Sequence, residues 1–246
     1  MDRVIYTAMS GANAAMYRQQ LLSNNLANVN TNGFRAEMAT FRHVPVRGEG
    51  ASTRVHALEA TAGHLDLPGT VATTGRPLDV AAQGQAYFAI QGLDGVEAYT
   101  RAGNLQISQN GNLVGHAGLP MLDAGGAPIT IPANAEVGIG SDGTISVKVA
   151  GENPQAVGRL KLVTPNAEAR LQRGEDGLFR GGDNQPLPAD PAAQLTAGAL
   201  EGSNVNPVEA MVNMISAARQ FEAQMKMIKT AEQDDQTASK LLGMNA

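Results

Sequence analysis

Apolar residues recur every three or four positions near the C-terminal end of the chain, as they do on one face of an α-helix. Asn206 can cap such a helix, Pro207 fits its first turn, and Glu209 lies three residues after the cap. No Gly or Pro follows until Gly243. The pattern therefore predicts one long helix over residues 206–243.

The apolar positions of this helix alternate in steps of three and four, which is the spacing of a heptad seam between packed helices. The predicted seam consists of Met211, Met214, Ala218, Phe221, Met225 and Ile228. A second stripe, Val208, Val212 and Ile215, lies on another face. Because the start of the helix is apolar on more than one side, we expect it to have more than one neighbour.

A weaker helical pattern covers residues 1–33, where apolar residues recur at Ile5, Met9, Ala12 and Met16. Charges are almost absent from this segment, and eight Asn or Gln side chains occur from residue 13 to residue 32. Uncharged amides suit a surface that packs against other chains, since they can donate and accept hydrogen bonds at once. The pair Asn32-Gly33 predicts the end of the helix.

The two helical segments supply the candidate subunit-interface residues. These are Ile5, Met9, Met16, Leu22, Leu26 and Val29 in the first segment, and Met211, Met214, Ile215, Ala218, Phe221, Met225 and Ile228 in the second. One seam buries too little to hold so long a helix. We therefore expect the helices to bury further faces against each other and against neighbouring subunits, with ends that order on assembly. The alternative, two helices packed on the core of a monomer, is disfavoured by the length of the second helix and the missing charges of the first.

The chain between the helices is rich in turn signals. Asp-Gly or Asn-Gly pairs at residues 94–95, 110–111, 142–143 and 176–177 lie near short apolar runs, as in β-hairpins. The runs that predict strands are Tyr87–Ile90, Leu105–Ile107, Ile129–Ile131, Thr144–Val149 and Leu160–Val163. Residues 181–191 contain three prolines and predict a loop. The sequence thus predicts an α+β fold, with helical ends (1–33 and 206–246), an extended connector (34–74) and a β-rich domain (75–205).

Composition excludes several classes of function. A net charge of −5 offers no basic face for nucleic acid, and the absence of Cys excludes disulfides and thiolate metal sites. No apolar run reaches the roughly 18 residues that span a bilayer. The N-terminal apolar stretch is interrupted at Tyr6, Thr7, Ser10 and Gly11, which argues against a cleavable signal peptide. If the protein leaves the cytoplasm, we expect another route to carry it.

No catalytic, cofactor-binding or metal-binding residues are predicted. His56 and His64, with Asp66 nearby, are the best candidate metal ligands, but ordinary loop histidines explain them better. Residues 139–143 approach a nucleophile elbow but lack its first glycine, and they make a good Asp-Gly hairpin turn. We therefore expect no enzyme activity and no cofactor. A secreted β-rich enzyme with helical ends is the alternative from another class.

Several stretches carry a resemblance that spans nearly the whole chain. They read NLANVNTNGFR at residues 25–35, GRPLDVA at 75–81, YTRAGN at 99–104, and GSNVN at 202–206 followed by MVNMI at 211–215. In this order they resemble the signatures of the flagellar axial proteins, the family of rod and hook subunits. Such a set is highly specific.

Within that family the chain is most similar to the F-type branch of the proximal rod, through residues 158–162, 174–180 and 230–236. The short segment between Phe34 and Gly75 fits the same branch, whereas distal rod and hook subunits, the alternative, carry more sequence there or in the middle. One departure is QAYF at residues 85–88, where the family often has an acidic residue, Gly and two Phe.

The resemblance implies an architecture and a cellular setting. The terminal helices would pair as a coiled coil in an inner tube domain, and the β-rich middle would form an outer domain. Subunits would stack helically with copies of themselves and with other proximal and distal rod proteins, in a periplasmic rod that transmits torque from motor to hook. The implied route is the flagellar type III export apparatus, with no nucleic-acid partner and no insertion into the membrane.

Overall fold

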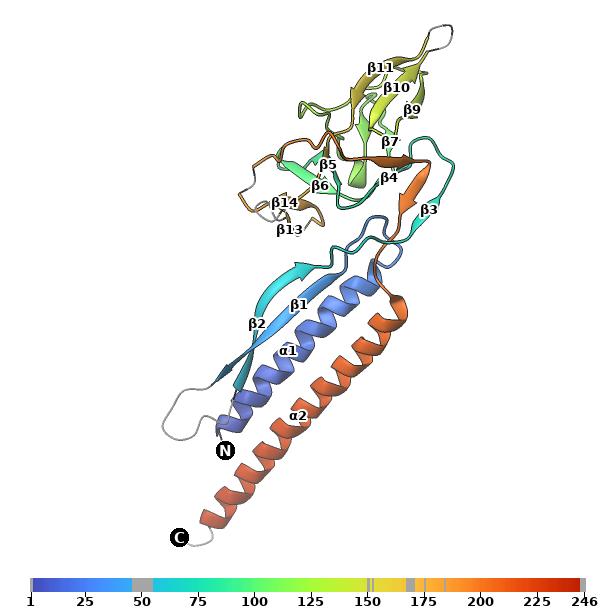
Figure 1. Ribbon diagram of the computed structural model, residues 1–246. Helices are drawn as coiled ribbons and strands as arrows, with labels where there is room; N and C mark the ends of the chain where they lie inside the picture. The colour runs from blue at the N-terminus through green and yellow to red at the C-terminus, as the bar shows by residue number, and fades with distance from the viewer. Residues whose placement is uncertain are drawn as a thin grey trace. The chain divides into compact units, whose positions relative to one another are not determined.

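The computed structural model describes residues 2–45, 55–149, 151, 153–166, 171–174, 176–183 and 185–243. They form an α+β fold with one long helix near each end of the chain and a β-rich middle (Figure 1). The chain divides into two compact units. Unit 1 comprises Met1–Ala27, Glu37–His64 and Asn206–Ala246, and unit 2 comprises Asn28–Ala36 and Leu65–Val205.

Unit 1 contains α1 (Asp2–Ala27), β1 (Glu37–Pro45), β2 (Val55–His64) and α2 (Pro207–Gly243). The predicted C-terminal helix is confirmed. Asn206 caps α2, because its side-chain oxygen accepts hydrogen bonds from the backbone N–H of Val208 at 3.1 Å and of Glu209 at 3.3 Å. α1 lies beside α2 along its length and also contacts both strands (Figure 1). Met1 and residues 244–246 of the predicted helical ends lie outside the described residues.

The first helix is shorter than the predicted segment 1–33, because it ends at Ala27. Asn28 starts a turn in which its backbone oxygen accepts from the N–H of Thr31 at 3.1 Å, and its side chain accepts from the Thr31 hydroxyl. Gly33 then has a φ of 70°, and a Cβ there would lie 2.3 Å from the backbone of Arg101. The segment after Ala27 thus belongs to unit 2, and the Asn-Gly pair marks a close approach within that unit.

Residues 34–74, expected as one extended connector, differ from that description. β1 and β2 pair with each other as an antiparallel hairpin from Glu37↔His64 to Pro45↔Val55, with an irregularity between Thr40 and Phe41. This hairpin packs on α1, where the Phe41 ring meets the Tyr17 ring edge-on at 6.3 Å. Burial of that aromatic face explains why the segment folds back on α1 and does not run as a free connector.

Unit 2 is built from short antiparallel strands. A five-stranded sheet has the order β12-β5-β6-β14-β13, a three-stranded sheet the order β11-β10-β9, and β15-β4, β16-β3 and β7-β8 form pairs. The bounds are β3 (Val71–Thr73), β4 (Val80–Ala82), β5 (Tyr87–Gln91), β6 (Glu97–Thr100), β7 (Gln106–Ile107), β8 (Leu113–Val114), β9 (Glu136–Ile139), β10 (Thr144–Lys148), β11 (Gln155–Arg159), β12 (Leu162–Val163), β13 (Leu171–Arg173), β14 (Phe179–Gly181), β15 (Leu195–Ala197) and β16 (Ala199–Glu201), with a 3-10 turn at His116–Gly118.

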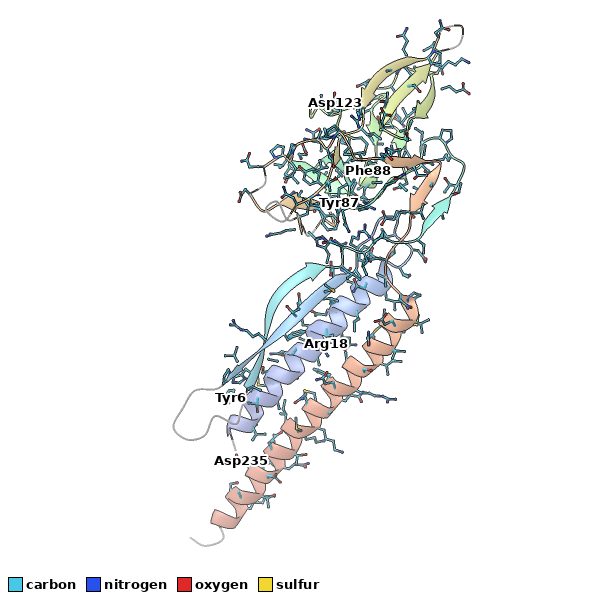
Figure 2. All side chains as sticks on the ribbon, viewed as in Figure 1. Tyr6, Arg18, Tyr87, Phe88, Asp123 and Asp235 are labelled. Atoms are coloured by element: carbon cyan, nitrogen blue, oxygen red, sulfur yellow. The ribbon has the colours of Figure 1, made fainter. Side chains whose placement is uncertain are left out.

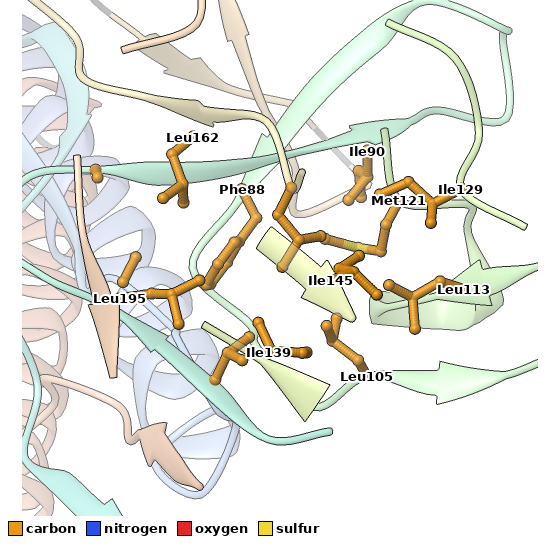
Figure 3. Close-up of a cluster of buried hydrophobic side chains, with 14 of the residues drawn as sticks. Phe88, Ile90, Leu105, Leu113, Met121, Ile129, Ile139, Ile145, Leu162 and Leu195 are labelled. Atoms are coloured by element: carbon orange, nitrogen blue, oxygen red, sulfur yellow. The ribbon is translucent and has the colours of Figure 1, made fainter. Parts of the chain in front are cut away.

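The core of unit 2 lies on both faces of β5. Phe88 and Ile90 point into the larger cluster, where they meet residues such as Met121 and Ile145 (Figure 3). The alternate residues Tyr87 and Ala89 join Tyr99 and Phe179 in a second, smaller cluster. Because successive side chains of a strand point to opposite faces, an unbroken apolar run is what a strand buried on both sides requires.

The turn predictions are confirmed, and the turns share one geometry. In the turns that end at Gly95, Gly111, Gly143 and Gly177, the glycine has a φ between 77° and 86°, and its N–H donates to the oxygen three residues earlier. In the three Asp-Gly turns the aspartate also accepts the N–H two residues on, at 3.1 Å. The predicted strand over residues 129–131 differs, since Thr130 forms only an isolated bridge to Asn112.

Candidate functional site on the helices of unit 1

Small residues line the contact between the two helices. On α2, Ala210, Ala217 and Ala231 are buried, with Gln224 at the intervening heptad position. A Cβ on Gly11 of α1 would lie only 3.0 Å from the Gln224 side chain, so the helices meet closely at this point. Small side chains allow that approach because helix separation depends on the residues at the contact.

The contact lies beside the predicted seam. Met214, Phe221 and Ile228 are half-buried as expected for seam residues, but Met211 and Met225 are exposed. Buried residues occur one position earlier, at Ala210 and Ala217, whereas Gln224 and Ala218 are half-buried. Of the six predicted seam residues, Met211 and Met225 are therefore exposed within the single chain, and the close contact between the helices is made at neighbouring Ala positions.

On α1 the buried apolar positions are also alanines, and one of them, Ala12, belongs to the predicted apolar pattern. These alanines are Ala8, Ala12 and Ala15, whereas Met9 and Met16 are 48% and 45% exposed. The other candidate residues of the first segment, Ile5, Leu22, Leu26 and Val29, are half-buried. Val29 does not lie on the helix, because α1 ends at Ala27 and residues 28–36 belong to unit 2. Contact of these residues with a second subunit stays a prediction.

Exposed apolar side chains occur on both helices, and we use the name outer face for two groups of them: Tyr6, Met9 and Met16 on α1, and Val208, Met211, Val212 and Ile215 on α2. Val208, Val212 and Ile215 are 69%, 57% and 56% exposed. Arg18 is the one charged residue between residues 4 and 27 of α1 and, like Tyr6, is labelled in Figure 2. Apolar side chains at i, i+3, i+4 and i+7 form a stripe that another helix can cover. The outer face is thus suited to bind a helical partner.

Two polar side chains of α1 tie it to the hairpin, and sequence reasoning missed them. The Asn25 amide donates to the Glu37 oxygen at 3.0 Å and accepts from the Glu37 N–H at 2.8 Å. The Ser10 hydroxyl lies 3.1 Å from both the N–H and the oxygen of Ala57. Each side chain therefore makes the backbone hydrogen bonds that a neighbouring strand would otherwise make with one residue of the hairpin. Part of the polar surface of α1 thus bonds to the chain's own backbone and not to another chain.

Replacing Asn25 with Ala is expected to lower the free energy of unfolding of unit 1 by about 1–3 kcal/mol, because both backbone groups of Glu37 would lose their partner. Chemical denaturation monitored by circular dichroism measures the change. Asn13→Ala, an exposed amide on the same helix, is the control and should change stability by less than about 0.5 kcal/mol. Equal effects of the two substitutions would contradict the role of Asn25.

Among the described residues, no group of three or more His, Cys, Asp or Glu could hold a metal ion. Ser141, in the near-elbow sequence, sits in the Asp142-Gly143 turn, where the Asp142 carboxylate accepts the Thr144 hydroxyl at 2.6 Å. That hydrogen bond, with the N–H of Thr144, holds the pKa of Asp142 below its usual value. Within the described part of the chain, neither helix has a stretch apolar and long enough for a bilayer.

Comparisons with known proteins agree on one family. Family models described as "Flagella basal body rod protein", "Flagellar hook protein FlgE/F/G D1 domain" and "Flagellar basal body rod FlgEFG protein C-terminal" match residues 5–35, 81–147 and 196–241. The flagellar basal-body rod protein FlgF of Salmonella typhimurium and that of Escherichia coli are each 43% identical over the full length of both chains. The rod protein FlgG of Bacillus subtilis is 34% identical, over 95% of this chain and 96% of its own.

Proposed function

Given that this chain belongs to the flagellar basal-body rod protein family, we propose that it enters the rod by packing the outer face of its two helices against the helices of neighbouring subunits. The protein is a structural subunit of the flagellar basal-body rod and not an enzyme. The observation that carries the proposal is the outer face itself. Apolar side chains exposed at helical spacing over both helices favour burial against further helices.

The helix pair would act as the inner domain of the assembly. The heptad positions at which Ala210, Ala217 and Ala231 are buried support a coiled-coil geometry for α1 and α2. The candidate residues Met9, Met16, Met211, Ile215 and Met225 would then contact neighbouring subunits. Met214, Phe221 and Ile228 would complete the pair within one chain, and unit 2 would form the outer domain.

The partners would be copies of this chain and other rod proteins, proximal and distal. We place the chain in the proximal rod, because the two relatives that are 43% identical over the full length, from Salmonella typhimurium and Escherichia coli, are both FlgF proteins. A distal-rod or hook-type role is the alternative. A periplasmic position and passage through the flagellar type III export apparatus, without a cleavable signal peptide, complete the proposal. The rod would transmit torque from motor to hook.

An in-frame deletion of the gene is expected to abolish swimming and to leave basal bodies whose rod stops short. Electron microscopy of isolated basal bodies and a soft-agar swimming assay provide the measurements. The intact gene supplied on a plasmid should restore both. A complete rod and hook in the deletion strain would refute a role in the proximal rod.

A further inference from the structure

Three buried charged side chains meet in unit 2. Arg35 and Arg101 lie in two of the stretches that carried the family resemblance, and Glu201 directly precedes a third. Glu201 at the end of β16 lies between Arg35 and Arg101, and all three side chains are at most 1% exposed. One oxygen of Glu201 is 3.0 Å from the Arg35 guanidinium. Its other oxygen accepts from two nitrogens of Arg101, one of them at 2.8 Å. Sequence reasoning gave no role to any of them.

The same residues hold three chain segments together. Residues 28–36, 65–70 and 199–205, which we call the junction segments, are the parts of unit 2 adjacent in sequence to unit 1. Glu201 accepts the N–H of Gly69 on its side chain at 3.0 Å and the N–H of Gly33 on its backbone oxygen at 2.8 Å. Arg35 donates to the backbone oxygen of Leu67. One carboxylate is thus bonded to all three segments.

Neighbouring groups fix the same segments. The Asn204 side chain accepts the N–H of Ala36 at 2.6 Å and donates to the oxygens of Leu65 and Leu67, each at 2.9 Å. A Cβ on Gly69 would lie 2.1 Å from the oxygen of Gly202, so the second and third segments touch through their backbones. The segments therefore have little freedom to slide past one another while these bonds hold.

This cluster buries two positive charges with only one negative charge, which is unfavourable for the stability of the fold. Two guanidinium groups share one buried carboxylate, and burial lowers the pKa of Arg101 against the opposing effect of Glu201. Within the described residues, Nε of Arg35 has no hydrogen-bond partner. Arg101 also donates to the backbone oxygens of Ala82 and Ala86, which partly compensates its burial. A buried ion cluster of this kind is often replaced by apolar side chains at no cost in stability, so its presence needs another reason.

We propose that Glu201 is a positioning residue that holds the three junction segments in a single register, with Arg35 and Arg101 as its two anchors. An apolar core can accept shifted packings, whereas a carboxylate that must reach two fixed guanidinium groups and the backbone N–H of Gly69 accepts only one arrangement. These segments are continuous in sequence with α1, the hairpin and α2. The link to assembly rests on the proposed function, whereas the register itself does not.

The test uses the full chain and compares two variants. Glu201→Gln removes the charge and leaves both arginines buried without a counter-ion, so amide exchange in residues 28–36, 65–70 and 199–205 is expected to accelerate about a hundredfold or more. The triple variant Arg35→Met, Arg101→Met, Glu201→Leu is expected to regain the thermal stability of the wild type. It should still exchange about tenfold faster in the junction segments and fail to restore swimming in the deletion strain.

A second buried ion pair provides the control. Lys161 lies 2.8 Å from Glu97 in unit 2, and both side chains are under 10% exposed. The double variant Glu97→Leu, Lys161→Met should leave exchange in the junction segments at the wild-type rate. Wild-type exchange in the triple variant, or wild-type swimming in both Glu201 variants, would overturn the proposal. If the intact gene failed to restore swimming in the deletion strain, the proposed function would be wrong. The exchange rates would still show whether Glu201 holds the junction segments in one register.

Discussion

The double substitution Val212→Asp, Ile215→Asp is expected to abolish swimming and to leave the isolated chain folded. Both side chains are more than half exposed in the single chain, so their carboxylates would be hydrated there at little cost. Against a neighbouring helix the same carboxylates would be buried without a partner, at a cost of several kcal/mol. The measurements are a swimming assay in the deletion strain and the thermal unfolding curve of the purified chain.

The matched control places two negative charges on another face of the same helix. Asn213 and Gln220 are exposed amides, and Asn213→Asp with Gln220→Glu hardly changes their shape. We expect this variant to swim. Wild-type swimming by the Val212, Ile215 variant would show that the outer face does not contact neighbouring subunits. Loss of swimming in the control would show that added negative charge on α2 blocks assembly whichever face carries it.

The substitution Ala217→Glu is expected to lower the free energy of unfolding of unit 1 by about 3 kcal/mol or more, because it forces a carboxylate into the close contact between α1 and α2. Ala217 is 1% exposed, whereas the next residue, Ala218, is half-buried at the edge of that contact. Ala218→Glu introduces the same side chain one position later and should cost less than about 1 kcal/mol. Denaturant titration of the purified chains compares the two.

This pair of variants also separates two descriptions of the seam. The sequence pattern places Ala218 in the seam, and the structure places Ala217 there. A larger loss of stability from Ala218→Glu would support the seam predicted from the sequence. Similar losses would mean that the helices contact each other less closely than Gly11 and Gln224 indicate.

Short-range sequence signals were sufficient to predict both ends of α2 and the four turns that end in glycine. The Asn206 cap, Pro207 and Gly243 act within a few residues, and so does a glycine with positive φ after an aspartate. The seam was predicted less well because hydropathy ranks Met above Ala. The distance between two helices depends on residues of both, and no single helix pattern contains that information.

The hairpin and the buried charges were missed for related reasons. Residues 37–64 carry no short Asn-Gly or Asp-Gly turn signal, so nothing local indicates that this segment pairs with itself. Arg35, Arg101 and Glu201 are of residue types that usually lie at the surface. Their burial depends on pairing across long stretches of chain, which one sequence without a fold cannot reveal.

The uneven distribution of methionine gives the two units different chemical sensitivities. Met121 is fully buried in unit 2, whereas Met9, Met16, Met211 and Met225 are almost half exposed on the helices of unit 1. Peroxide transfers an oxygen atom to an accessible thioether and leaves a polar sulfoxide in place of an apolar side chain. A chain oxidised before incorporation would therefore lose apolar contact area on its helices and keep the core of unit 2. In the packing that we propose, neighbouring subunits would shield the same sulfur atoms in a finished rod.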